Sequence, residues 1–137
     1  MDALEIPKHI FSQMLAQAQE QAPIEACGIL AGGDHRVERL YTMANTDESS
    51  DHFTMAPEEQ FAVIKDMRSK GLEMLAIYHS HPASPARPSE EDIRLAFTPG
   101  VIYVIVSLQD SSEPQIRGFT IDGEDVSESA VTVIEEN

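Results

Sequence analysis

Two histidines one residue apart constrain this chain more than any other feature. His79 and His81 stand at the end of an apolar run, residues 74–78, which is typical of a buried strand. Alternate residues of a strand point to the same face of a sheet, so the two imidazoles can reach one point. The sequence therefore predicts a strand that ends where two nitrogen donors converge.

A third donor follows at a fixed distance. A proline-rich loop, residues 82–88, leads to Ser89, and Asp92 falls in the first turn of a predicted helix. Two histidines and one aspartate suit Zn²⁺, and three protein ligands leave a fourth position open for water. The spacing predicts a catalytic metal site held by His79, His81 and Asp92, because a structural site has no open position.

Glu25 lies upstream, before a Cys-Gly-apolar segment that begins a predicted strand. Together, Glu25 and the pattern His79-x-His81-x7-Ser89-x2-Asp92 resemble the JAMM (MPN+) zinc metalloprotease family. The resemblance implies one JAB1/Mov34-like MPN domain, an α/β fold with a mixed central sheet flanked by helices. It also implies a bound Zn²⁺ held by the two histidines and the aspartate.

The resemblance implies roles for two more residues and a class of substrate. Glu25 takes a proton from the attacking water and passes it to the departing amine, and Ser89 stabilises the tetrahedral oxyanion. Family substrates are joined to the C-terminal Gly-Gly tail of a ubiquitin-like domain. Small prokaryotic members release cysteine from sulfur-carrier proteins of the ThiS/MoaD type, or ubiquitin-like modifiers from lysine.

The expected partner is accordingly a small β-grasp carrier or modifier with a Gly-Gly end, and the expected reaction is hydrolysis of the amide bond after that end. Family members that specialise in ubiquitin linkages carry two insertions near the site. This chain has little room for them, because the links at residues 45–51 and 97–100 are short. The resemblance therefore favours a carrier or modifier over a ubiquitin chain.

Three alternatives stay open on the sequence alone. Ser89 and Asp92 also match a helix-capping pattern and could serve only the helix. The chain could be a non-catalytic interaction module of the MPN type, although such modules have typically lost one or more ligands. RadC-like proteins share the His-x-His-Pro motif, but the strong negative charge counts against a role on DNA.

Composition narrows the setting. The 24 acidic and 9 basic residues give a net charge of −15, which repels a nucleic-acid backbone. The length predicts one domain, residues 1–137, with an acidic tail from about residue 122. The apolar runs are too short to span a membrane and the N-terminus lacks a signal-peptide layout, so we expect a cytoplasmic protein. The single cysteine, Cys27, is expected to be a small buried apolar residue.

Periodicity places the remaining elements. A first helix opens at Pro7 and ends before Pro23, and a second covers residues 57–70 with Phe61, Ile64 and Met67 toward the core. A third helix, with Asp92 in its first turn, continues to residue 96. Besides the strand that ends in the histidine pair, strands are expected at residues 27–31, 37–43, 101–108, 115–121 and 131–134.

Overall fold

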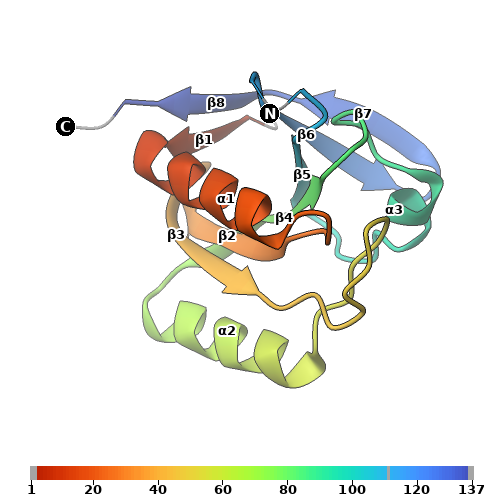
Figure 1. Cartoon of the computed structure of the whole chain (residues 1–137). Helices are drawn as coiled ribbons and strands as arrows, with labels where there is room; N and C mark the ends of the chain where they lie inside the picture. The colour runs from red at the N-terminus through yellow and green to blue at the C-terminus, as the bar shows by residue number, and fades with distance from the viewer. Residues whose placement is uncertain (1–2, 111, 136–137) are drawn as a thin grey trace.

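The computed structural model describes residues 3–110 and 112–135 of the chain. Within these ranges the chain forms three helices and eight strands (Figure 1). In chain order they are β1 Leu4–Pro7, α1 Lys8–Gln21, β2 Cys27–Gly33, β3 Arg36–Met43, α2 Pro57–Ser69, β4 Glu73–His81, α3 Glu90–Arg94, β5 Ile102–Ser107, β6 Gln115–Asp122, β7 Asp125–Ser129 and β8 Val131–Ile134. None of the described helices is long and apolar enough to cross a membrane.

All the described strands join one sheet in the order β7-β6-β5-β4-β2-β3-β1-β8. The strand that carries the histidines, β4, lies inside this sheet, antiparallel to β2 and parallel to β5. The predicted mixed sheet is therefore confirmed. His79 stands beside Cys27 on one neighbour and beside Ile105 on the other, so the end of β4 is enclosed by backbone on both sides.

One face of the sheet is covered by α1. This helix buries Ile10, Met14 and Ala18, which recur at helical spacing and pack with Leu30 of β2 and Tyr78 of β4. Side chains alternate along β4, so the face opposite Tyr78 receives His79. The first helix is thus confirmed, with Pro7 just before its first turn instead of inside it.

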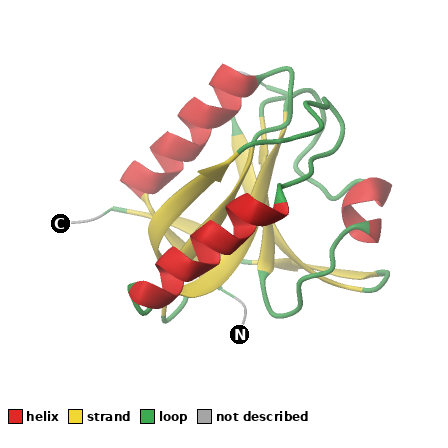
Figure 2. Ribbon diagram, turned by 90° about the horizontal axis from the view of Figure 1, so that it is seen from below, coloured by secondary structure: helices red, strands yellow, loops and turns green. Residues whose placement is uncertain are grey.

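The other face is covered by α2, and Figure 2 shows the two long helices on either side of the sheet. Val63 and Met67 of α2 pack with Cys27 and Ile29 of β2. The expectation for Phe61 is wrong, because its side chain is 74% exposed. Phe61 precedes Val63 by two residues, about 200° around the helix, so burying Val63 turns Phe61 to solvent.

Three elements near the ends of the chain and around the site differ from expectation. Strands β1 and β7 were not predicted. Strands β7 and β8 give residues after 122 a place in the sheet, β7 next to β6 and β8 next to β1. Strand β8, at residues 131–134, is confirmed, and it pairs in parallel with β1. Helix α3 ends at Arg94, short of residue 96, and none of its residues is buried, so no packed face extends it.

Candidate metal centre and active site

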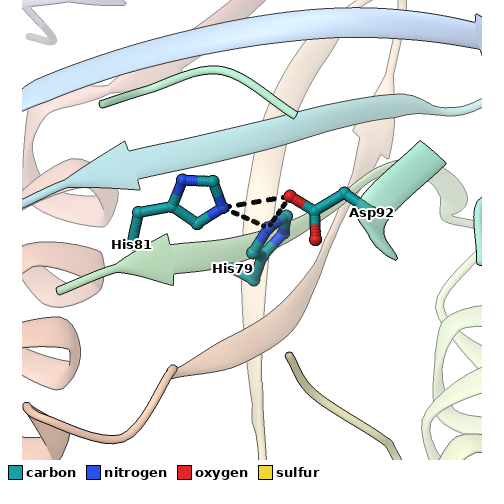
Figure 3. Close-up of side chains that lie close together, drawn as sticks. All are labelled: His79, His81 and Asp92. Atoms are coloured by element: carbon teal, nitrogen blue, oxygen red, sulfur yellow. Dashed lines mark hydrogen bonds and ion pairs between the residues drawn. The ribbon is translucent and has the colours of Figure 1, made fainter. Parts of the chain in front are cut away.

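The two histidines and the aspartate meet at the end of β4. His79 and His81 project from that strand, and Asp92 reaches them from α3 (Figure 3). The two Nε2 atoms lie 3.1 Å apart, and Asp92 Oδ2 lies 3.1 Å from His79 Nε2 and 3.0 Å from His81 Nε2. Among the described residues this is the one cluster of His, Cys, Asp and Glu side chains that could hold a metal ion.

The hydrogen bonds of His81 test whether a cation fits here. Its Nδ1 lies 2.8 Å from the carbonyl oxygen of Pro85, which can only accept, so Nδ1 carries a proton. In a neutral imidazole Nε2 then presents a lone pair to the carboxylate of Asp92. Two acceptors 3.0 Å apart need a proton or a metal ion between them.

The spacing of the three atoms also fits a metal ion. Ligands of a tetrahedral zinc site lie about 3.4 Å from one another when each metal–ligand distance is about 2.1 Å. The three separations in this chain, 3.0–3.1 Å, are within a few tenths of an ångström of that value. Both the donor set and its geometry are therefore compatible with a metal ion held by these three atoms.

The protonation states favour metal binding. Burial raises the pKa of Asp92, but its hydrogen bonds with His79 and His81 outweigh burial and hold that pKa well below its usual range. Burial lowers the pKa of His79, so this imidazole is neutral at pH 7. For His81 burial also lowers the pKa, but bonds to Asp92 and Pro85 outweigh it and raise the pKa overall. A metal ion bound at His81 Nε2 would displace a proton from that atom and leave the Nδ1 proton on the Pro85 carbonyl.

Ser89 and Asp92 form the capping box that the sequence allowed. The Ser89 hydroxyl oxygen accepts the Asp92 backbone N–H at 3.0 Å, and Asp92 Oδ2 accepts the Ser89 N–H at 2.9 Å. Helix capping and the contacts with the two histidines therefore share one carboxylate oxygen. The Ser89 hydroxyl proton has no acceptor among the described residues, so it is available to a group that enters the site.

Glu25 lies two residues before β2 and close enough to His81 and Asp92 for their charges to affect its pKa. Its residue is 2% exposed and its Oε1 has no hydrogen-bond partner within the described ranges. Burial raises the pKa of Glu25 to about 8, against the opposing effect of nearby His81. A carboxyl group of this kind exchanges protons near neutral pH, which a general acid–base residue must do.

Several residues around the site were not anticipated as functional. Asn45 is a buried loop residue that hydrogen bonds to the backbone carbonyl of Glu25, and Phe53 stacks on His79 with ring centroids 4.8 Å apart. Ser80, between the two histidines, accepts the Ala26 N–H at 2.8 Å. Neither the asparagine in a polar loop nor the serine carries a sequence signal, because each acts through a segment far away in the chain.

An apolar cavity of about 90 Å³ borders the metal ligands. It is large enough for a small side chain, and it opens beside His79 and Asp92. Its remaining lining is mainly apolar and comes from the loop before α2, from the residues on either side of α3, and from β5 and β6: Phe53, Pro88, Leu95, Tyr103, Ile105 and Ile121.

Cys27 lies near Glu25 in sequence but has a different part in the structure. Its side chain is fully buried, and its thiol donates a weak hydrogen bond to the carbonyl oxygen of Met43 at 3.7 Å. Burial raises the pKa of the thiol to about 12. The expectation of a small buried apolar residue is confirmed, since a thiol with this pKa is unreactive at pH 7.

A mixed sheet that presents a His-x-His pair to an aspartate on the next helix, with a buried glutamate beside them, defines a JAB-type domain. The chain belongs to the family of prokaryotic homologs of the JAB domain, whose model matches residues 7–122. The expected family and fold class are thereby confirmed.

Comparison with individual proteins supports this family assignment. The chain is 36% identical over 135 residues to the CysO-cysteine peptidase of Mycobacterium tuberculosis, covering 97% of this chain and 92% of that protein. It is 33% identical over 102 residues to a desampylase of Pyrococcus furiosus, covering 74% and 72%. The solution structure of protein DSY2949 from Desulfitobacterium hafniense superposes with a TM-score of 0.89 at 46% identity, covering 97% of this chain and 94% of that one.

Proposed function

We propose that this chain is a zinc-dependent peptidase that hydrolyses the amide bond after the C-terminal Gly-Gly of a small ubiquitin-like or sulfur-carrier protein. The observation that carries the proposal is the convergence of His79 Nε2, His81 Nε2 and Asp92 Oδ2 within 3.1 Å of one another. The full ligand set, with Glu25 buried beside it, favours an enzyme over a non-catalytic module of the same fold.

The chemistry divides between the cofactor and the chain. When bound, Zn²⁺ would lower the pKa of a coordinated water from 15.7 toward about 7. Glu25 would accept the proton that the water loses and deliver it to the departing amine. Ser89 donates its hydroxyl proton to the oxyanion of the attacked carbonyl.

The form of the chain supports a small protein substrate. The link from α3 to β5 covers residues 95–101, and the link from β3 to α2 covers residues 44–56, so neither holds an inserted domain. Recognition then depends on the narrow tail, which can lie extended against the site, and on modest contact with the carrier body. The CysO-cysteine peptidase matches 97% of this chain and the desampylase matches 74%. The longer match favours a carrier–cysteine bond as the bond that is cleaved.

The test is a side-by-side assay with three substrates at equal concentration: a Gly-Gly-ended carrier joined to cysteine, the same carrier joined to lysine, and diubiquitin. We expect the zinc-loaded chain to cleave the carrier–cysteine substrate fastest. We expect Glu25→Gln to retain zinc but lose on the order of 10²-fold in rate or more. No cleavage of any substrate would overturn the proposed activity in favour of the interaction module, and faster cleavage of diubiquitin would overturn the proposed substrate.

A further inference from the structure

The proposed acid–base residue lies outside the strand ladder. Strand β2 begins at Cys27, which pairs with His79 on one side and Met43 on the other. Glu25 precedes this first pair by two residues and is nevertheless 2% exposed. A buried peptide group without a ladder partner needs hydrogen bonds from another segment. The position of Glu25 is therefore set by whatever supplies them.

One loop supplies the hydrogen-bond partners of both the N–H and the carbonyl group of Glu25. The backbone N–H of Glu25 donates to the carbonyl oxygen of Ser49 at 2.9 Å, and the backbone carbonyl of Glu25 accepts from Asn45 Nδ2 at 3.1 Å. Ser49 and Asn45 both belong to the link between β3 and α2. This link takes the place of a neighbouring strand for the residue that we propose moves the proton.

Asn45 is the centre of that loop. Asn45 is only 6% exposed. Its Nδ2 also donates to the carbonyl oxygen of His52 at 3.0 Å. Its Oδ1 accepts the backbone N–H groups of Asp47 and Thr54, each at 3.2 Å. An amide is required, because the Asn45 side chain donates to the carbonyls of Glu25, His52 and, at 3.4 Å, Ser49, and accepts from two N–H groups.

The same loop forms a wall of the metal site. Phe53 lies between His52 and Thr54, whose backbones both hydrogen bond to the Asn45 side chain. Its ring stacks on the His79 ring at an interplanar angle of 28°. His52 and Phe53 both line the apolar cavity beside the ligands. Through one side chain, the backbone of Glu25 and the aromatic wall over His79 are fixed relative to each other.

We propose that Asn45 is a positioning residue that sets the place of Glu25 relative to the metal ligands. The inference rests on the proposed function for its effect on rate, but the positioning itself is independent of activity. Ser80 fixes the neighbouring residue by accepting the Ala26 N–H and by donating its own N–H to the Ala26 carbonyl at 2.9 Å. Asn45 alone among the described side chains bonds to the backbone of Glu25 itself.

The experiment compares Asn45→Ala and Asn45→Asp with the wild-type chain by amide hydrogen exchange and by kinetics. Asn45→Asp retains the acceptor oxygen but removes the Nδ2 group that donates to the backbone carbonyls. In each variant we expect exchange of the Glu25 amide to rise by on the order of 10-fold, while the Ser80 amide, which bonds to Ala26, keeps its protection. We expect kcat to fall by on the order of 10-fold or more with KM and zinc content near wild-type values.

Thr46→Ala is the matched control. Thr46 lies beside Asn45 and its hydroxyl donates to the Thr54 carbonyl at 3.1 Å, so its removal loosens the loop without touching Glu25. We expect wild-type exchange at the Glu25 amide and wild-type kcat from this variant. Unchanged Glu25 exchange in both Asn45 variants, or an equal rise at Glu25 and Ser80, would overturn the inference. An inactive wild-type chain would refute the proposed function but leave the exchange comparison decisive for Asn45.

Discussion

At the scale of single residues, Glu25 is a carboxyl group held in an environment far from water. Desolvation disfavours its charged form, so the folded chain binds the Glu25 proton more tightly than the unfolded chain does. The stabilising contribution is complete below the ordinary pKa of 4.5 and is lost as pH rises through about 8. Above that pH the folded chain carries a buried carboxylate whose Oε1 has no hydrogen-bond partner among the described residues.

This linkage gives a prediction for the metal-free protein. Relative to wild type, Glu25→Gln should gain stability as pH is raised from about 5 to 9, because glutamine cannot acquire the buried charge. Urea unfolding of both proteins in the presence of a chelator, at several pH values, measures the difference. Glu124→Gln, at an exposed turn residue, controls for loss of one charge. A difference between wild type and Glu25→Gln that stays constant across this range would contradict the assigned environment.

The residues of the site were not equally visible in the sequence. His79, His81 and Asp92 could be predicted because strand and helix periodicity fix where each side chain points. Asn45 and Phe53 could not, since their contacts with Glu25 and His79 depend on how a long loop folds back on β4. The roles of Glu25 and Ser89 came from the family resemblance, and both remain predictions that the variants above test.

At the scale of elements, β2 shows how tightly the strand beside the histidines is packed. A Cβ atom on Gly28 would lie 2.5 Å from the Tyr78 ring and 2.6 Å from the Tyr41 carbonyl oxygen. Tyr78 is fully buried and adjoins His79, so its ring cannot give way without moving β4. Glycine at this position lets the backbone of β2 approach the strand that holds the metal ligands.

Gly28→Ala should therefore destabilise the fold by about 1–3 kcal/mol, the usual range for overpacking. Gly33→Ala is the matched control on the same strand. A Cβ atom added at Gly33 would lie 3.9 Å from Glu38 Oε2, which is an ordinary contact distance. Denaturant unfolding of the two variants measures the contrast. Equal stabilities would show that the Tyr78 ring moves aside freely.

Elements with strong periodicity were predicted well, and short ones were not. The helical spacing of Ile10, Met14 and Ala18 identified α1, and the buried β-branched run identified β5. Strand β1 has four residues and four of the five residues of β7 are exposed, so their pairing depends on neighbours rather than on an apolar pattern of their own. Phe61 was misplaced because the apolar residues of α2 allow two faces, and packing with β2 selects Val63.

At the scale of the whole molecule, the proposed metal site joins parts that the sheet alone does not connect. Asp92 comes from a five-residue helix with no buried residue, held to β4 by the histidines and by its own capping box. A metal ion that binds the folded chain and not the unfolded one stabilises it by mass action. Zinc should thus raise the unfolding temperature, and His81→Ala should abolish that rise, as differential scanning calorimetry with and without zinc would show.

The most direct test of the central claim is the stoichiometry of zinc binding, measured by calorimetric titration of the metal-free protein. For the wild-type chain and for Glu25→Gln we expect about one zinc per chain, because neither the ligands nor their spacing differ between them. For His79→Ala and Asp92→Ala we expect binding at that site to be lost. Unchanged stoichiometry and affinity in both ligand variants would contradict the assignment of the metal centre, and the proposed reaction would fall with it.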